Sequence, residues 1–167
     1  MHPKYSFKYH HSVIHMSHRV EVIKAMAVIG LNRLDGLTKE LDEGLLDWKP
    51  EPEANTIRWI LTHESYILHV VLPWVFRSQR GYRPEGWPDD YQGNPTYSLE
   101  KILGDLETGR EGVLEALERL TDEELAEEID FFEDRTREWS ILWLISEHIH
   151  HEGQVAAILS HRKRFEG

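Results

Sequence analysis

Residues 136–160, TREWSILWLISEHIHHEGQVAAILS, decide the fold and carry the densest group of chemically active side chains. Apolar residues flank a polar centre, in which one carboxylate and three imidazoles fall within the five residues from Glu147 to His151. Ionisable groups are costly to bury among apolar residues unless something pairs with them. A bound divalent metal would pair with several at once. The stretch therefore predicts a helix from about Thr136 to Ser160 that carries metal ligands.

Helical spacing allows two inward faces for this stretch. Residues three or four apart lie on one face of a helix, and both Glu147 with His151 and His148 with Glu152 have that spacing. Two donors at such a spacing can reach one ion at about 2.0–2.2 Å. The face through His148 would also bury Glu152, so we favour the face through Glu147 and His151. Periodicity alone leaves both open.

A second helix offers the donor that would complete such a site. It is expected to begin near Asn55 or Thr56, both good N-cap residues, and to kink or end at Pro73. His63 lies in its middle on an inward apolar stripe, one turn after Trp59. Facing helices of a bundle supply ligands to a common core site, so His63 is the best candidate for the third ligand.

The remaining segments also read as helices with polar connectors. A first helix is predicted from about Val13 to Leu34, stopped by Asp35-Gly36, and a third follows the N-cap Ser98 to about Leu120. A short helix follows a capping-box pattern at Thr121. Strict alternation of apolar and polar residues, the pattern of a half-buried strand, is nearly absent, which argues against a sheet. We predict an all-α four-helix bundle, a single domain over residues 1–167, with a long crossover between helices 2 and 3.

Two features of the connecting chain bear on function and packing. Residues 79–96 form the longest irregular stretch, and a loop of that length is either a packed surface loop or a site lid. Gly104, Gly109 and Gly112 weaken the third helix by roughly 1 kcal/mol each relative to Ala. We expect that they let a neighbouring helix approach closely.

Composition excludes several classes of function. The 167 residues hold 19 Lys and Arg against 30 Asp and Glu, a formal charge of 19 − 30 = −11, which disfavours nucleic-acid binding. There is no cysteine, so any metal must use nitrogen and oxygen donors. Neither a signal peptide nor a membrane-spanning run is expected, and we predict a soluble cytoplasmic protein without membrane partners.

Three segments resemble the DinB-like (DinB/YfiT) superfamily of metal-binding four-helix bundles. Asp47-Trp48-Lys49-Pro50 leading to residues 55–63 looks like the family's entry into the helix that bears its first metal histidine. Residues 120–125, LTDEEL, are similar to its connector before the last helix. Residues 139–154 resemble that last helix, in which two ligands four residues apart precede a Gly-Gln pair.

The resemblance implies a ligand set. Anchored on Gly153-Gln154, it places the second ligand of the last helix on His151 and the first on Glu147, where the family most often has His. With His63 these form the implied triad, and His148 is the fallback if the helix is rotated. A carboxylate favours harder ions, so the divalent ion is open among zinc, nickel, iron and manganese. No organic cofactor and no particular catalytic residue is predicted.

The implied activity is metal-dependent activation of a thiol or water, as in thiol-dependent transferases or isomerases and in hydrolases, with a small molecule or low-molecular-weight thiol as substrate and a homodimer as the assembly. His150 and Glu64 would support the ligands.

One alternative is a non-catalytic metal- or ligand-binding bundle that acts through dimerisation. A dinuclear carboxylate site of ferritin type would need Glu147 and His150 both to face inward. The N-terminal histidines, His10, His11, His15 and His18, are interpreted as a solvated helix start.

Overall fold

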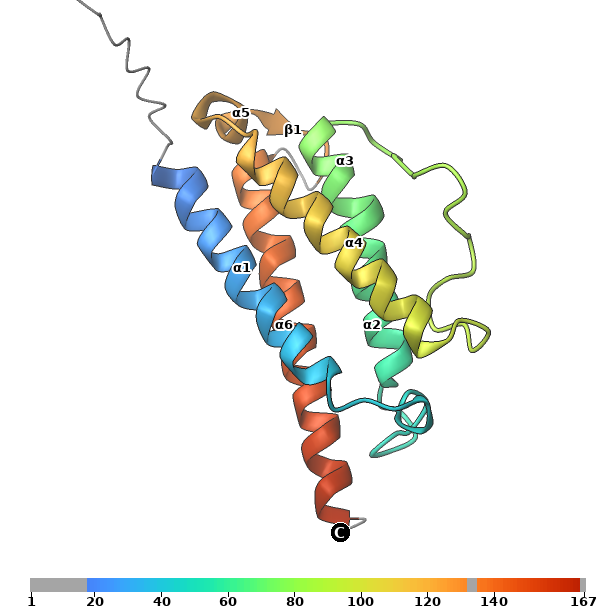
Figure 1. The fold of residues 1–167 in the computed structure, drawn as a ribbon. Helices are drawn as coiled ribbons and strands as arrows, with labels where there is room; N and C mark the ends of the chain where they lie inside the picture. The colour runs from blue at the N-terminus through green and yellow to red at the C-terminus, as the bar shows by residue number, and fades with distance from the viewer. Residues whose placement is uncertain (1–17, 132–134, 166–167) are drawn as a thin grey trace, which may run out of the picture.

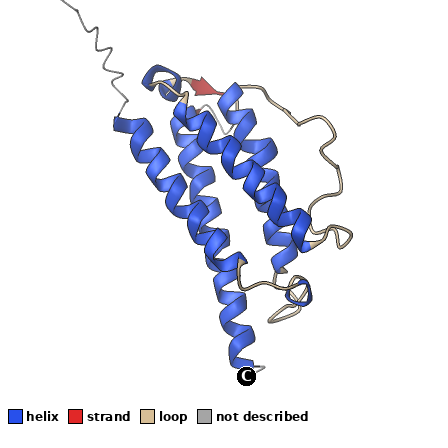
Figure 2. Ribbon diagram, viewed as in Figure 1, coloured by secondary structure: helices blue, strands red, loops and turns tan. Residues whose placement is uncertain are grey.

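The computed structural model describes residues 18–131 and 135–165, and these are mostly helical, which confirms the all-α class (Figures 1 and 2). In chain order the elements are α1 (His18–Thr38), the 3-10 turn η1 (Glu43–Leu45), α2 (Ile57–Tyr66), the π-turn η2 (Ile67–Val71), α3 (Leu72–Arg77), α4 (Leu99–Glu118), α5 (Asp122–Ala126), β1 (Glu128–Ile129), β2 (Arg135–Thr136) and α6 (Arg137–Phe165). The two short strands pair antiparallel, a small departure from the expectation of no sheet.

Helices α1 and α6 run parallel and side by side (Figure 1). Ion pairs hold α6 against α1 and the residues just after it, from Arg19 with Glu138 near the helix beginnings to Lys163 of α6 with Glu40, two residues past the end of α1, where Nζ and the carboxylate lie 2.5 Å apart. Helix α4 packs on α1 and on α2, and α2 also contacts α6. No described helix is long and apolar enough to cross a membrane.

One predicted helix boundary is wrong. Helix α1 does not stop at Asp35-Gly36 but runs on to Thr38, whose hydroxyl donates to the carbonyl of Asp35 at 2.9 Å. Residues 13–17, where that helix was expected to start, lie outside the described residues. The second helix was expected to kink or end at Pro73, and regular α-helix does give way just before it, because α2 ends at Tyr66 and a π-turn follows. The chain passes through the π-turn into α3, with Pro73 in the first turn of α3, where no backbone donor is needed.

Three of the predicted helix starts are confirmed. The hydroxyl of Thr56 accepts from the amide of Trp59 at 3.0 Å, and Ser98 caps α4 in the same way. Thr121 and Glu124 form the capping box that opens α5. Helix α6 starts at Arg137, one residue after the predicted position, and extends past Ser160 to Phe165.

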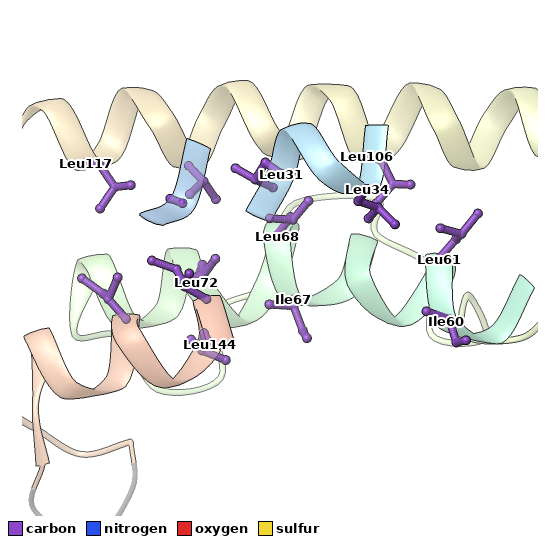
Figure 3. Packing of buried hydrophobic residues seen from close by; sticks show 14 of the residues in the cluster. Leu31, Leu34, Ile60, Leu61, Ile67, Leu68, Leu72, Leu106, Leu117 and Leu144 are labelled. Carbon is purple, nitrogen blue, oxygen red and sulfur yellow. The ribbon is translucent and has the colours of Figure 1, made fainter. Parts of the chain in front are cut away.

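The core lies between the helices and is lined by aliphatic side chains. Figure 3 shows Leu31 and Leu34 of α1 meeting Leu68 of the π-turn and Leu106 of α4. Burying one such side chain contributes about 1.5–3 kcal/mol. Close approach of α4 to the π-turn depends on Gly109, because a Cβ there would lie 2.7 Å from that of Leu68. At Gly104 and Gly112 a Cβ would meet nothing within 4 Å, so the close-approach expectation holds for Gly109 alone among the three.

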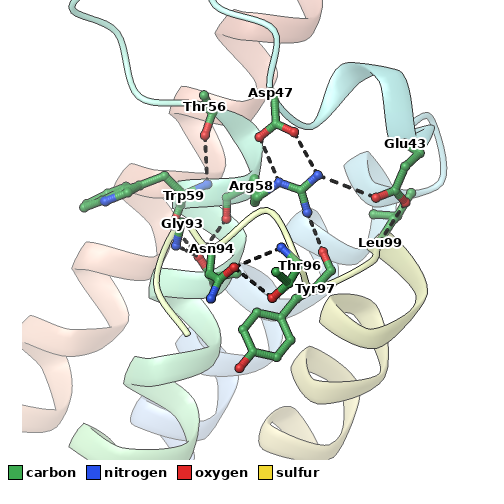
Figure 4. Close-up of polar contacts among 11 residues, drawn as sticks. Glu43, Asp47, Thr56, Arg58, Trp59, Gly93, Asn94, Thr96, Tyr97 and Leu99 are labelled. Carbon is green, nitrogen blue, oxygen red and sulfur yellow. Dashed lines mark hydrogen bonds and ion pairs between the residues drawn. The ribbon is translucent and has the colours of Figure 1, made fainter. Parts of the chain in front are cut away.

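A buried arginine fixes the start of α2 (Figure 4). The Arg58 side chain is 4% exposed, and its Nε and Nη2 each donate to the Asp47 carboxylate at 2.8 Å. Nη1 donates to the carbonyl of Tyr97, at the end of the irregular segment. These hydrogen bonds hold the pKa of Asp47 below its ordinary value. Arg58 therefore ties the segments before α2 and before α4 to the helix that carries His63.

Candidate metal centre

Two imidazoles from different helices meet at one end of the core. The rings of His63 on α2 and His151 on α6 lie 4.9 Å apart between centroids, inclined at 77°. Trp59, one turn before His63, stacks on that ring at 4.9 Å. His151 is buried and His63 half-buried, so the pair has a buried side and a side open to solvent. The structure thus brings these two predicted ligands together.

Each of the two rings has one nitrogen held by a glutamine amide. His151 Nδ1 lies 3.0 Å from Oε1 of Gln154, and because a carbonyl oxygen only accepts, Nδ1 carries the hydrogen and Nε2 keeps its lone pair in the neutral ring. The amide nitrogen of Gln92 lies 2.9 Å from His63 Nδ1. Metal-ligating histidines commonly donate their second N–H in the way that His151 does. At His63 the Gln92 amide nitrogen donates to Nδ1 instead, so the hydrogen of the neutral ring lies on Nε2, and Gln92 would have to turn its amide oxygen toward Nδ1 before Nε2 could bind a metal.

His63 favours its neutral form, the form that binds metals. Burial lowers the pKa of His63 below its ordinary value of 6.5, and the neighbouring His151 lowers it further. Glu64 and Glu147 oppose that shift by electrostatic attraction without reversing it. The imidazole is therefore uncharged near neutral pH, which is the protonation state in which histidine binds metals.

Glu147, the predicted third ligand, is half-buried on α6 one turn before His151. Its charge acts on His63, but within residues 18–131 and 135–165 no three His, Asp or Glu side chains are arranged to hold a metal ion as they stand. Two donors are therefore side by side, and a third does not join them in this arrangement.

The favoured inward face of α6 requires a correction. His148, His151 and Glu152 are all buried, with 5%, 6% and 5% exposure, so the face through His148 also packs inward. Glu152 tolerates burial because Arg33 reaches it from α1, with 2.9 Å between Nη2 and the carboxylate. His148 turns toward α2 and donates from Nδ1 to Oε2 of Glu64.

The model of the DinB superfamily matches residues 28–155, well over half of the sequence. The chain belongs to the DinB superfamily. A crystal structure of a conserved protein from Enterococcus faecalis has a similar fold, with a TM-score of 0.61 and 13% sequence identity over 86% of this chain and 95% of that one. At 13% identity this similarity supports a shared fold and nothing further. No curated protein matches the chain. The single domain over residues 1–167 stays a prediction.

The side chains of this DinB protein fit a metal in their chemistry. Two imidazole nitrogens and a carboxylate are a donor set that divalent ions such as zinc accept. Glu64 adds a second observation. Its side chain is fully buried, its Oε1 has no hydrogen-bond partner among the described residues, and that oxygen lies 3.9 Å from His151 Nε2. A cation held beside His151 would compensate this buried charge.

One contact of the site was not expected from the sequence, and the burial of Glu64, which was expected to support the ligands, has a signal in the sequence. Gln92 reaches His63 from the irregular segment 79–97, which is held on α2 by a 2.8 Å hydrogen bond from the amide of Gly93 to Thr62. No local sequence pattern predicts the contact between Gln92 and His63. The burial of Glu64 does leave a signal, because its neighbours at three and four residues on either side are all apolar: Ile60, Leu61, Ile67 and Leu68.

The other histidines among the described residues do not join the pair. His150 is exposed and accepts at Nε2 from the Gln154 amide at 3.0 Å, so the inward Glu147 and His150 arrangement of a dinuclear site is not formed. His10, His11 and His15 lie outside the described residues, and His18 is exposed at the start of α1.

Proposed function

We propose that this DinB protein is a metal-dependent enzyme in which His63, Glu147 and His151 bind one divalent ion. The observation that carries the proposal is the meeting of the His63 and His151 rings from two helices, 4.9 Å apart. The bound ion would supply Lewis acidity that lowers the pKa of a thiol or water. Zinc, nickel, iron and manganese all accept this donor set, and the carboxylate favours the harder of them.

The roles of the surrounding residues follow from their contacts. Gln154 holds the tautomer of His151, and Gln92 holds the ring of His63 from the irregular segment. Trp59 covers one face of the His63 ring. Glu64 supplies a buried negative charge beside His151 that favours a cation there. Glu147, one turn before His151, is the proposed third donor.

The proposed substrate is a small molecule or low-molecular-weight thiol, and the proposed reaction is a thiol-dependent transfer or isomerisation, or a hydrolysis. Access is supported by the half-buried position of His63. The proposal includes the architecture of a DinB-like four-helix bundle, made of α1, the α2–α3 run, α4 and α6, with residues 79–97 as the crossover. A cytoplasmic location also belongs to the proposal.

A second candidate is a non-catalytic metal- or ligand-binding bundle that acts through dimerisation. One observation favours it: Val22, Met26 and Ile29 form an exposed apolar stripe along α1, with 57%, 37% and 58% exposure. A homodimer could cover that stripe, and an enzyme can also be dimeric. Open coordination positions on the metal distinguish the two candidates, because a closed site cannot take a thiol.

Cobalt binding with a thiol tests the proposal. The protein would be prepared untagged and metal-free, with His10, His11 and His15 changed to Gln so that the N-terminal histidines do not contribute. It would be loaded with Co²⁺ and titrated with 2-mercaptoethanol. We expect one Co²⁺ per chain and a thiolate-to-cobalt charge-transfer band in the parent, and neither in His63→Ala. The variant His161→Ala, which removes an exposed histidine of α6, should behave as the parent.

Two results would count against the enzyme. Failure of the parent to bind Co²⁺ would remove the metal centre itself. Co²⁺ binding with a spectrum unchanged by thiol, together with no metal-dependent ester or amide hydrolysis, would leave the non-catalytic bundle. Elemental analysis of protein grown in metal-replete medium then identifies the ion.

A further inference from the structure

The charged side chains around the proposed metal centre are carboxylates. Glu64 of α2 is fully buried, and its Oε1 lies 3.9 Å from Nε2 of His151. That oxygen has no hydrogen-bond partner among the described residues, whereas Oε2 accepts from Nδ1 of His148. Glu147 is half-buried on α6, one turn before His151, and its negative charge acts on His63 together with that of Glu64. The centre therefore combines one fully buried and one half-buried carboxylate.

The other groups that contact the two histidine rings of the centre are uncharged. Gln92 and Gln154 each place a side-chain amide on one ring, and Trp59 stacks on the ring that Gln92 contacts. His150 is exposed beside them, and its Nε2 accepts a hydrogen bond from the Gln154 amide, so that nitrogen carries no proton. These neighbours therefore leave the charge of the two carboxylates uncompensated.

The arginines on or against the two ligand-bearing helices are paired with other acids. Arg58 of α2 is buried and binds the Asp47 carboxylate, with 2.8 Å between Nε and Oδ1. Arg33 of α1 reaches α6 at Glu152, with 2.9 Å between Nη2 and the carboxylate. Within residues 18–131 and 135–165, no Lys or Arg forms an ion pair with either carboxylate of the centre. A negatively charged group on a substrate would therefore find no cationic side chain to bind it there.

The charge of the occupied centre follows from these contacts. Two carboxylates cancel the two positive charges of a divalent ion, so a thiol that binds as its thiolate, after releasing its proton to water, leaves an excess negative charge. The chain as a whole carries −11, which adds a field of the same sign. We propose that the substrate of this centre is a thiol that carries a positively charged group, and that thiols with a negatively charged group bind poorly. This inference rests on the proposed metal function and names its substrate class.

Three thiols that share a two-carbon chain and differ in charge test this preference. Thiocholine is positive, 2-mercaptoethanol is neutral and 2-mercaptoethanesulfonate is negative. Each would be titrated at about pH 8 into the Co²⁺-loaded full-length protein described above, with dissociation constants expressed per thiolate so that differences in thiol acidity drop out. We expect each unit of charge to change the affinity about fivefold, so thiocholine should bind about 25-fold more tightly than the sulfonate. This difference should shrink in about 0.5 M NaCl, because salt screens it.

Two variants test whether the buried carboxylate causes the preference. Glu64→Gln keeps the shape of the side chain but removes its charge, and it should reduce the 25-fold difference to about fivefold or less. Glu111→Gln removes an exposed carboxylate of α4 and should leave the difference unchanged.

The salt dependence tests the same charge in the parent, without any substitution. The inference is overturned if the three thiols bind within about twofold of one another, if the sulfonate binds most tightly, or if Glu64→Gln discriminates as the parent does. These results would leave the metal centre standing. Failure of the parent to bind 2-mercaptoethanol at all would instead overturn the proposed thiol chemistry, and this inference with it.

Discussion

Replacing Gly109 by Ala should destabilise the protein, whereas the same change at Gly104 should stabilise it. Both glycines lie inside α4, where Ala is favoured over Gly by about 1 kcal/mol. A Cβ at position 109 would lie 2.7 Å from Leu68 Cβ and 3.0 Å from His69 Nε2, whereas at position 104 it would meet nothing within 4 Å. The partner atom at Leu68 is the rigid base of its side chain, so α4 and the π-turn would have to separate.

The magnitude follows from two opposing effects. Overpacking a close contact costs about 1–3 kcal/mol, from which the helix preference of Ala removes about 1 kcal/mol. Gly109→Ala should therefore lower the free energy of unfolding by about 1 kcal/mol, and Gly104→Ala should raise it by about the same amount. For a chain of this size, 1 kcal/mol moves the midpoint of thermal unfolding by about 2–4 °C.

Urea and thermal unfolding of the parent and both variants, followed by circular dichroism, measure the difference. Gly112→Ala serves as a second control, because a Cβ there also meets nothing within 4 Å. The packing account is wrong if Gly109→Ala stabilises the protein as much as the two controls do.

Three further changes test the supports of the site. Arg58→Met should lower the free energy of unfolding in urea by about 2 kcal/mol, because it removes charged hydrogen bonds to Asp47 and to a buried carbonyl. Arg119→Met, at an exposed position, should lower it by less than about 0.5 kcal/mol. Equal losses in the two variants would contradict the proposed role of Arg58. The pKa of His63 is lowered in the folded state, so protonation below 6.5 favours unfolding, and metal-free protein should lose this stability as the pH falls. His63→Gln should gain stability relative to the parent between about pH 7 and 5, and a constant difference across that range would refute the lowered pKa. Glu64→Gln, which keeps the shape but removes the charge, should weaken zinc binding by about tenfold in calorimetry, and unchanged affinity would remove Glu64 from the site.

The fold was largely predictable because its signals are local. The side chains of Thr56, Ser98 and Thr121 cap helices in the way that their own neighbours dictate. The wrong boundary at Asp35-Gly36 and the form of the break before Pro73 both depend on contacts that are distant in the sequence. Asp35-Gly36 resembles a helix stop, but α1 packs along α6 beyond that point. The π-turn before Pro73 is set against α4 through Gly109, a contact that no local pattern contains.

The meeting of His63 and His151 could be predicted in part. The apolar stripe of α2 indicates the face of His63, whereas periodicity left two faces open on α6, and the structure buries both His151 and His148. An inward face through His148 was the less favoured alternative, because it would also bury the Glu152 carboxylate, which lies one turn further on the same face. Arg33 of α1 pairs with that carboxylate, and the partner of a buried charge on another helix cannot be read from periodicity.

Calorimetric titration of zinc into the metal-free protein tests the central claim, that α2 and α6 hold one ion between them. The account predicts one zinc per chain, with affinity reduced by at least about 100-fold in both His63→Ala and His151→Ala and unchanged in the exposed control His161→Ala. Zinc affinity that survives His63→Ala but is lost in His151→Ala would place the ion on α6 alone and contradict the account.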